Sequence, residues 1–333
     1  MFLQGKAQLA EIFQTEPVFL FEDDDLLNFA REQGVNAATF DADGLISGSD
    51  AKLSSDVVFV VSDRTLPRAW AGAGELNTKN VLQIPTHAFD GRTCASAYTL
   101  SMCASLDLVD CVARNNAVLA ELTSQRQKFS FRSECSTVCF TLADEIRLMP
   151  TATSQIIKDA EDYALSTYTE VALIPNKIRA NEISPDALGY NVNGSFECHG
   201  CLVALHFGIE GENAVRKRRL VELIDRLHQE NEFPLTVHIA CSQMVAVRTK
   251  SGVDVSEFFL GEMNEVLAEN LIEVALGTNV GANRETLDWT INSPINESAL
   301  GFHVAIGDGT RCPHVDFICA CPDAYDAFFD ATA

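Results

Sequence analysis

Short apolar runs alternate with helix-compatible stretches over the first 130 residues of this 333-residue chain. The run Val57–Val61 shows the pattern most clearly, because its β-branched side chains favour a buried strand. Strands that alternate with helices along a chain usually assemble into a parallel sheet covered by those helices. The elements predicted in this part are strands at Pro17–Phe21, Val57–Val61 and Val81–Pro85 and helices at Asp23–Gln33 and Ala95–Leu122.

The pattern changes near residue 130, where short strands follow one another with few helices between them. The turn-forming pair Asn193–Gly194 predicts a bend between two strands. We therefore expect an α/β protein of two lobes, with an N-terminal α/β sheet domain over residues 1–130 and a C-terminal mixed α/β domain over residues 131–333. The further elements predicted are strands at Phe129–Phe131, Thr137–Leu142, Glu145–Leu148, Cys201–Leu205, Leu235–Ala240, Met244–Val247 and Phe317–Cys319, and helices at Ala214–Glu232 and Val255–Val274. The apolar face predicted for the first of these helices is Val215, Leu220, Leu223, Ile224 and Leu227.

Acidic side chains outnumber basic ones 47 to 24, which gives a formal net charge of −23. A chain of this charge repels phosphate backbones, so we expect no nucleic-acid partner, whereas it attracts cationic or amine-bearing ligands. No apolar stretch reaches the roughly 18 residues that a membrane span needs, and Met1–Lys6 lacks the features of a signal peptide. We therefore expect a cytoplasmic protein without a membrane partner, in which the 11 cysteines are mostly free, buried thiols.

Two histidines and an aspartate near the C-terminus have the composition of a metal site. His314–Val315–Asp316 places an imidazole and a carboxylate two positions apart, and His303 precedes them in an apolar segment. Imidazole and carboxylate groups are common ligands of divalent transition metals. A metal site built from these three side chains is therefore the sharpest functional hypothesis that the residues themselves offer.

The segments around these residues resemble the aminopeptidase T/aminopeptidase S family. Asn270–Asn279 resembles the segment that carries a metal-binding glutamate in that family, His303–Gly307 resembles its next ligand segment, and His314–Asp316 resembles its terminal His-x-Asp pair. A fourth segment, Asn181–Pro185 followed by Val192–Gly194, is similar to the region that supplies the first glutamate. The likeness covers roughly residues 130–322.

The resemblance implies a metallopeptidase that holds divalent zinc, cobalt, manganese or iron, acts on a peptide with a free α-amine and forms a homodimer. Two neighbouring ions can activate a water molecule and polarise a carbonyl group, which is the chemistry of peptide-bond hydrolysis. Glu182 would be a further ligand or the catalytic general base, and Glu273 lies at the end of a predicted helix. The metal ligands implied by the resemblance are Glu182, Glu273, His303, His314 and Asp316.

The chain departs from the family pattern in three places. Thr310 stands where the family has a tyrosine, Asn181 replaces a glycine, and only ten residues separate His303 from His314. Some relatives of this scaffold belong to peptide natural-product pathways, where they bind precursor peptides rather than cleave them. The departures therefore favour an alternative function, a non-catalytic peptide-binding or chaperone-like protein in peptide natural-product biosynthesis that needs no metal.

The same scaffold resembles 2,5-dihydroxypyridine dioxygenase, which holds one non-haem iron with two histidines and an aspartate. His303, His314 and Asp316 would supply such a two-histidine, one-carboxylate site. The residue that corresponds to Glu273 is a histidine in that enzyme, so an iron-dependent ring-cleaving dioxygenase is the third alternative.

Two cysteine pairs, Cys198/Cys201 and Cys319/Cys321, have spacings that would permit a structural zinc site. They lie beside predicted strands, which direct alternate side chains to opposite faces, so ordinary buried thiols are the simpler interpretation. The basic run Arg216–Arg219 is expected to form a solvated helix face that pairs with nearby acids.

Overall fold

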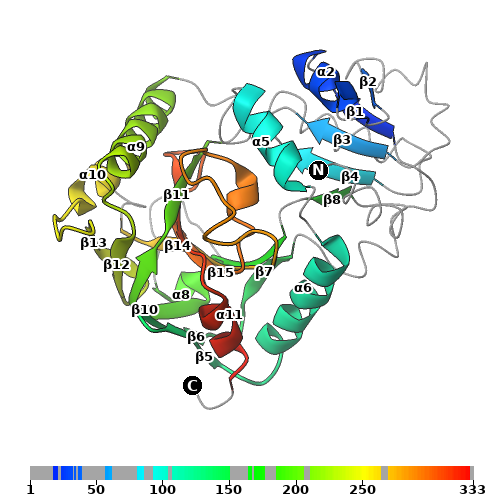
Figure 1. The fold of residues 1–333 in the computed structure, drawn as a ribbon. Coiled ribbons are helices and arrows are strands. Elements are labelled where there is room, and N and C mark those ends of the chain that lie inside the picture. Colours follow the sequence, from blue (N-terminus) through cyan, green and yellow to red (C-terminus); the bar gives the residue numbers. More distant parts are fainter. Residues whose placement is uncertain are drawn as a thin grey trace.

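The described residues of the protein form three sheets, shown in the ribbon of Figure 1. The computed structural model describes residues 18–21, 24–32, 34, 37–39, 57–61, 81–85, 93–103, 107–150, 164–166, 169–176, 185–205, 211–263 and 269–330. Within these residues the predicted mixture of α and β structure is confirmed.

Sheet A is a five-stranded parallel sheet with the strand order β2-β1-β3-β4-β8. Its strands are β1 (Val18–Phe21), β2 (Ala37–Thr39), β3 (Val57–Val61), β4 (Val81–Pro85) and β8 (Ala164–Ser166). The predicted parallel sheet is confirmed, and so is the first predicted helix, which is α2 (Asp24–Glu32). β8 comes from beyond residue 130, so sheet A includes a strand from the part of the chain that follows the first 130 residues (Figure 1).

The single long helix predicted at Ala95–Leu122 is wrong. The structure has α5 (Thr93–Cys103) and α6 (Leu108–Leu122) in its place. Asp107 starts the second helix, because its side chain accepts a hydrogen bond from the Asp110 backbone nitrogen at 2.9 Å and so caps the first turn.

Sheet B is antiparallel, with the order β13-β12-β10-β6-β5. Buried and exposed residues alternate along β6, which indicates one face on the core and one toward solvent. The bend predicted at Asn193–Gly194 is wrong, because both residues lie inside the continuous strand β10. Gly194 is required there for close packing, since a Cβ would lie 2.1 Å from the carbonyl oxygen of Thr137. The strands are β5 (Lys128–Ser133), β6 (Ser136–Leu142), β10 (Tyr190–Cys198), β12 (Leu235–Ala240) and β13 (Gln243–Arg248).

Sheet C has six antiparallel strands in the order β11-β16-β15-β14-β9-β7. Every residue of β14 and β15 is buried, so both faces of this sheet are covered. The helix predicted at Val255–Val274 is wrong where the structure describes the segment beyond Leu260. Among its described residues only α10 (Ser256–Leu260) is helical, and Glu273 belongs to a strand. The strands are β7 (Arg147–Pro150), β9 (Glu170–Ile174), β11 (Gly200–Ala204), β14 (Leu271–Gly277), β15 (Gly301–Ile306) and β16 (His314–Cys319).

Stacked phenylalanines join sheet B to sheet C. Phe131 on β5 lies parallel to Phe302 on β15, with ring centroids 4.2 Å apart. Phe328 of helix α11 (Pro322–Phe328) stacks on Phe129 at 4.9 Å. All four rings are fully buried, and the stack therefore forms the centre of the shared core.

The remaining helices are short except for α9 (Glu212–Gln229), which confirms the helix predicted at Ala214–Glu232. Its buried face is Leu220, Leu223, Ile224 and Leu227, as predicted. Val215 is 42% exposed, and its assignment to that face was wrong. The other short helices are α8 (Pro185–Leu188) and the 3-10 turn η1 (Pro294–Asn296).

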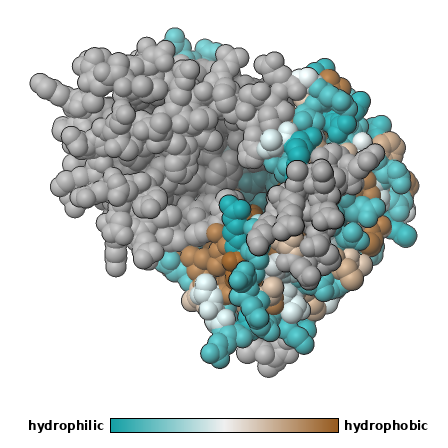
Figure 2. All heavy atoms as spheres, turned by 180° about the vertical axis from the view of Figure 1, so that it is seen from behind, coloured by the Kyte–Doolittle hydropathy of each residue, from teal (hydrophilic) through white to brown (hydrophobic). Residues whose placement is uncertain are grey.

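On the face seen from behind, the described residues are mainly hydrophilic, with hydrophobic residues scattered among them (Figure 2). No helix among the described residues is long and apolar enough to cross a membrane.

Candidate functional site

Three neighbouring strands of sheet C direct their polar residues to one face. Glu273 on β14 lies opposite Ala305 on β15, and Ala305 lies opposite Asp316 on β16. Residues opposite each other on paired strands, and residues two apart on one strand, share a face. His303 and His314 therefore point to the same side as Glu273 and Asp316, on strands whose other residues are apolar.

Strand β9 adds a second glutamate to this face. Glu170 lies opposite Gly277 on β14, at an even spacing from Glu273, and so shares its face. His303 lies opposite Ala275, between the levels of the two glutamates. As a result, the Nε2 atom of His303 is 3.5 Å from Glu170 Oε2 and 3.5 Å from Glu273 Oε1.

The other imidazole contacts the opposite side of Glu273. His314 Nε2 is 3.6 Å from Glu273 Oε2 and 2.9 Å from Asp316 Oδ1. Its Nδ1 atom is 2.8 Å from the carbonyl oxygen of Gly307, the kind of contact that fixes the ring orientation of metal-binding histidines. Glu273 therefore lies between two imidazoles and presents one carboxylate oxygen to each.

Glu297 completes the set from outside the sheet. It directly follows η1, and its carboxyl group interacts with that of Asp316. The six side chains are named the acid–imidazole cluster and are Glu170, Glu273, Glu297, His303, His314 and Asp316.

The electrostatics of both histidines are dominated by the neighbouring carboxylates. Burial alone would lower the pKa of His303, but Glu273, Glu170 and Asp316 outweigh it and raise the pKa to about 9. Burial also acts against the charged form of His314, whose pKa is nevertheless raised to about 10, chiefly by Asp316. Without a bound metal ion, both rings are therefore protonated and positively charged at neutral pH.

The buried acids differ among themselves. Burial raises the pKa of Glu170 to about 8, although His303 opposes the shift. Burial, with the charge of Asp316, also raises the pKa of Glu297 well above its ordinary value. Burial also tends to raise the pKa of Asp316, but the charge and the hydrogen bond of His314 outweigh burial and lower that pKa. Several groups of the cluster are therefore protonated at neutral pH, and a divalent cation would compete with these protons for the same ligand atoms.

The chemistry of the donor set fits a metal. Neither ring nitrogen of the fully buried His303 has a hydrogen-bond partner among the described residues, which is costly unless something else occupies the position. One ligand atom each from Glu170, Glu273 and His303 can be chosen so that all lie within 4.8 Å of one another. Imidazole with carboxylates suits zinc, manganese, cobalt or iron.

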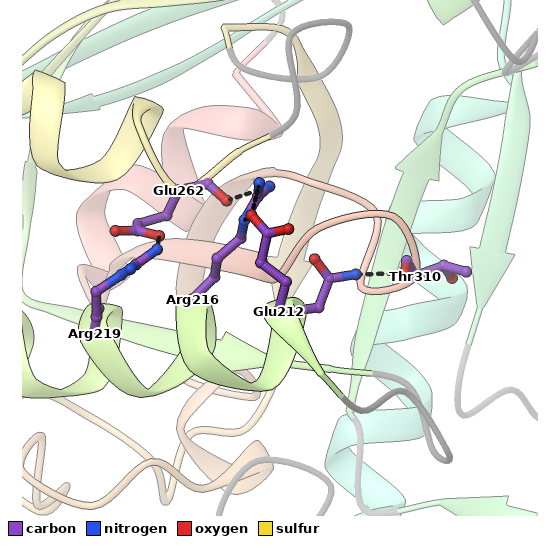
Figure 3. A network of polar contacts seen from close by, with 6 residues as sticks. Glu212, Arg216, Arg219, Glu262 and Thr310 are labelled. Carbon is purple, nitrogen blue, oxygen red and sulfur yellow. Dashed lines mark hydrogen bonds and ion pairs between the residues drawn. The ribbon is translucent and has the colours of Figure 1, made fainter.

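Thr310, which stands where the resembled family has a tyrosine, is exposed. Its carbonyl oxygen accepts a hydrogen bond from Asn213 at the start of α9, at 3.2 Å (Figure 3). Asp308 tightens the same loop, because its Oδ1 atom accepts hydrogen bonds from the backbone nitrogens of Thr310 and Arg311 at 3.0 and 2.7 Å. The segment between the two histidines is therefore a closed turn fastened to α9.

Two of the arginines beside this turn, Arg216 and Arg219, pair with acids. Arg216 contacts Glu212 one helical turn earlier, and Arg219 contacts Glu262 (Figure 3). The pairing ties the outer face of α9 to the end of α10.

Four of the five predicted site residues meet in the cluster, namely Glu273, His303, His314 and Asp316. The fifth, Glu182, lies outside the described residues. Sequence reasoning missed Glu170 and Glu297. A signal for Glu170 was present, because Glu170–Leu173 and Glu273–Leu276 are the same four residues, Glu-Val-Ala-Leu, on strands that pair with each other.

Solved structures that are similar to this protein include two that cover nearly the whole chain. Wild-type AmpT from Thermus thermophilus is 15% identical, with a TM-score of 0.45 over 95% of this chain and 92% of its own. The 2,5-dihydroxypyridine dioxygenase from Pseudomonas putida KT2440 is 12% identical, with a TM-score of 0.44 over 95% of this chain and 89% of its own. No curated protein matches the sequence.

A family model gives the assignment. It spans residues 14–324 and therefore includes sheet A, sheet B, sheet C and every member of the acid–imidazole cluster. Its description is crocagin biosynthetic protein CgnE/B. The chain belongs to this family of crocagin biosynthetic proteins.

Proposed function

We propose that this protein binds a peptide during the biosynthesis of a peptide-derived natural product, without cleaving it. The observation that carries the proposal is membership of a biosynthetic family over residues 14–324. The net charge of −23 supports a ligand with a free amine or other cationic groups, since an acidic protein attracts such a ligand over a distance.

The position of Thr310 supports a binding role over a catalytic one. The resemblance to peptidases implies a tyrosine at this position, and here the residue is exposed and held by its backbone to α9. Asp308 accepts a hydrogen bond from the backbone nitrogen of Thr310, and this turn holds the backbone of Thr310 beside α9.

Titration calorimetry with candidate peptides that carry a free α-amine tests the proposal. We expect binding that is unchanged by EDTA, and an intact peptide by mass spectrometry after prolonged incubation. A scrambled peptide of the same composition is the control for charge attraction alone. Metal-dependent cleavage of the peptide, or rapid turnover of an aminoacyl p-nitroanilide, would contradict the proposal.

The second candidate is a divalent-metal aminopeptidase, and the position of Glu273 between two imidazoles favours it. His303 and Glu170 would hold an ion on one side of Glu273, and His314 with Asp316 would hold one on the other. Glu182 remains a proposed further ligand or general base. Bound divalent ions would supply an activated water and a polarised carbonyl. The protein's own part would be to exclude water and to orient each ligand.

Elemental analysis of protein purified without chelator tests this candidate. We expect bound metal in the wild type and its loss in His314→Ala, with Glu197→Gln, a carboxylate on β10 outside the cluster, as the matched control. A content below about 0.2 ions per chain that does not change in His314→Ala would remove the candidate, because a closed set of ligands binds tightly.

A further inference from the structure

Four cysteines gather at the corner where sheet B passes into sheet C. Cys198 ends β10 and Cys201 lies in β11, with only His199 and Gly200 between them. Their sulfur atoms are 3.6 Å apart, which is van der Waals contact. The Cys198 thiol donates to the carbonyl oxygen of Gly200 at 3.1 Å. The two sulfurs are therefore already adjacent, and a disulfide needs only a short approach to about 2.05 Å.

The end of β16 brings the second pair to the same corner. His199 donates its backbone N–H to the carbonyl oxygen of Ile318 at 2.7 Å, and the backbone nitrogen of Ala320 donates to His199 Nδ1 at 3.2 Å. Cys319 and Cys321 flank Ala320. The name thiol corner is used below for Cys198, Cys201, Cys319 and Cys321.

The four thiols differ in access and acidity. Cys198, Cys201 and Cys319 are buried, whereas Cys321, at the start of α11, is partly exposed. A hydrogen bond from Cys319, against the opposing effect of burial, lowers the pKa of Cys321 to about 6. Cys321 is therefore a thiolate at neutral pH within reach of solvent, and the thiolate is the reactive form of cysteine.

We propose that the thiol corner is a redox site in which Cys198 and Cys201 close into a disulfide by exchange with a low-molecular-weight disulfide such as glutathione disulfide. The Cys321 sulfur attacks the external disulfide, forms a mixed disulfide and releases one thiolate. The Cys319 sulfur then attacks Cys321 and releases the second thiolate. Exchange with Cys198 and Cys201 moves the bond inward and returns Cys319 and Cys321 to thiols. The net change oxidises one dithiol by two electrons and reduces one external disulfide to two thiols.

A metal is the competing occupant of four clustered thiols. Among the described residues, the compact donor group is Glu170, Glu273 and His303, and no atom of the thiol corner belongs to it. The contact between Cys198 and Cys201 therefore favours a disulfide over a cysteine–metal site.

Mass spectrometry of the folded chain in glutathione buffers of increasing oxidised fraction tests the proposal, with free thiols blocked before digestion. Cleavage after Lys and Arg places Cys198 and Cys201 on one peptide, residues 180–216, and Cys319 and Cys321 with Cys312 on another, residues 312–333. We expect the first peptide to lose two hydrogen atoms and to escape blocking reversibly. The proposal fails if this peptide stays reduced throughout, or if the stable disulfide joins Cys319 to Cys321.

Variants test the order of the steps. Cys321→Ser is expected to slow oxidation of the 180–216 peptide at least about tenfold with the same end point, because the exposed thiolate is lost. Cys139→Ser, which removes an exposed cysteine of sheet B, is the matched control and should leave the rate unchanged. An unchanged rate in Cys321→Ser would overturn its role as the first nucleophile. Zinc content measured on the same samples would overturn the disulfide assignment if it fell on Cys198→Ser.

Discussion

Sheets B and C are both antiparallel, yet their polar residues lie in opposite environments. In β6 of sheet B buried and exposed positions alternate strictly, so Thr137, Cys139 and Thr141 face solvent. In β14 and β15 of sheet C every residue is buried, including Glu273 and His303. A polar residue on sheet B is therefore hydrated, whereas one on sheet C must find partners inside the protein.

The difference explains where chemistry can arise. A carboxylate on a solvated face titrates much as it does in water, and nearby charges are screened. In the covered sheet, burial raises the pKa of Glu170 to about 8 against the attraction of His303. Burial lowers the pKa of His303, but the neighbouring carboxylates outweigh it and raise the pKa to about 9. The covered sheet therefore creates the perturbed groups that mark a candidate site.

The largest expected effect comes from breaking the aromatic contact between the two sheets. Phe302→Ala removes a fully buried ring stacked on Phe131 and should lower the free energy of unfolding by roughly 3–5 kcal/mol. Urea denaturation measures this change. Thr141→Ala, on the solvated face of β6, is the control and should change stability by less than about 0.5 kcal/mol. Equal effects of the two substitutions would contradict the contrast between the sheets.

The next effect depends on pH and concerns His199, at the corner between the sheets. Burial lowers its pKa from 6.5 to about 4, so the folded protein keeps it neutral while the unfolded chain takes up a proton. Its contribution to stability is complete above pH 6.5 and is lost as the pH falls toward 4, to a limit of about 3 kcal/mol.

Comparison of wild type with His199→Gln at pH 7 and pH 4.5 isolates this contribution. Glutamine retains an acceptor for the Ala320 backbone nitrogen but cannot titrate. We expect the variant to lose less stability on acidification than the wild type. Equal losses of stability in the two proteins would contradict the expectation and would show that His199 is hydrated in the folded protein.

A smaller effect is expected where α5 holds the segment that carries Glu297. The Tyr98 hydroxyl donates to Asn296 Oδ1 at 2.9 Å and accepts from the Asp288 backbone nitrogen at 2.9 Å. Tyr98→Phe should cost about 1–3 kcal/mol, because the buried side-chain oxygen of Asn296 loses its hydrogen-bond donor. Thermal unfolding measures the loss, and an unchanged midpoint would mean that water replaces the hydroxyl.

The smallest effect is expected on the outer face of α9. Arg219 is 54% exposed, so its ion pair with Glu262 is screened by solvent (Figure 3). A double-mutant cycle with Arg219→Ala and Glu262→Ala should give a coupling free energy of about 0.2–1 kcal/mol that falls at high salt. A larger coupling free energy that does not change with salt would contradict this expectation, because it is typical of a buried pair such as those in sheet C.

Local sequence patterns correctly predicted those elements for which the tertiary surroundings favour the same secondary structure. The α9 helix was predictable because four apolar residues recur at helical spacing. The first part of β14, Leu271–Val274, was assigned to a helix, because periodicity does not distinguish a strand buried on both faces from a buried helix. At Asn193–Gly194 turn chemistry was misleading, because the glycine is needed for the approach of β6 to β10.

The sequence by itself determined the α/β class, the parallel first sheet and the grouping of His303, His314 and Asp316 as one candidate site, because these depend on short-range pattern and spacing. Only the tertiary structure decided that Glu170 and Glu297 join them. Glu170 lies more than a hundred residues before Glu273 and meets it because β9 pairs with β14. Strand pairing is decided by the burial of whole faces, a property of the assembled sheets that spacing along the chain does not contain.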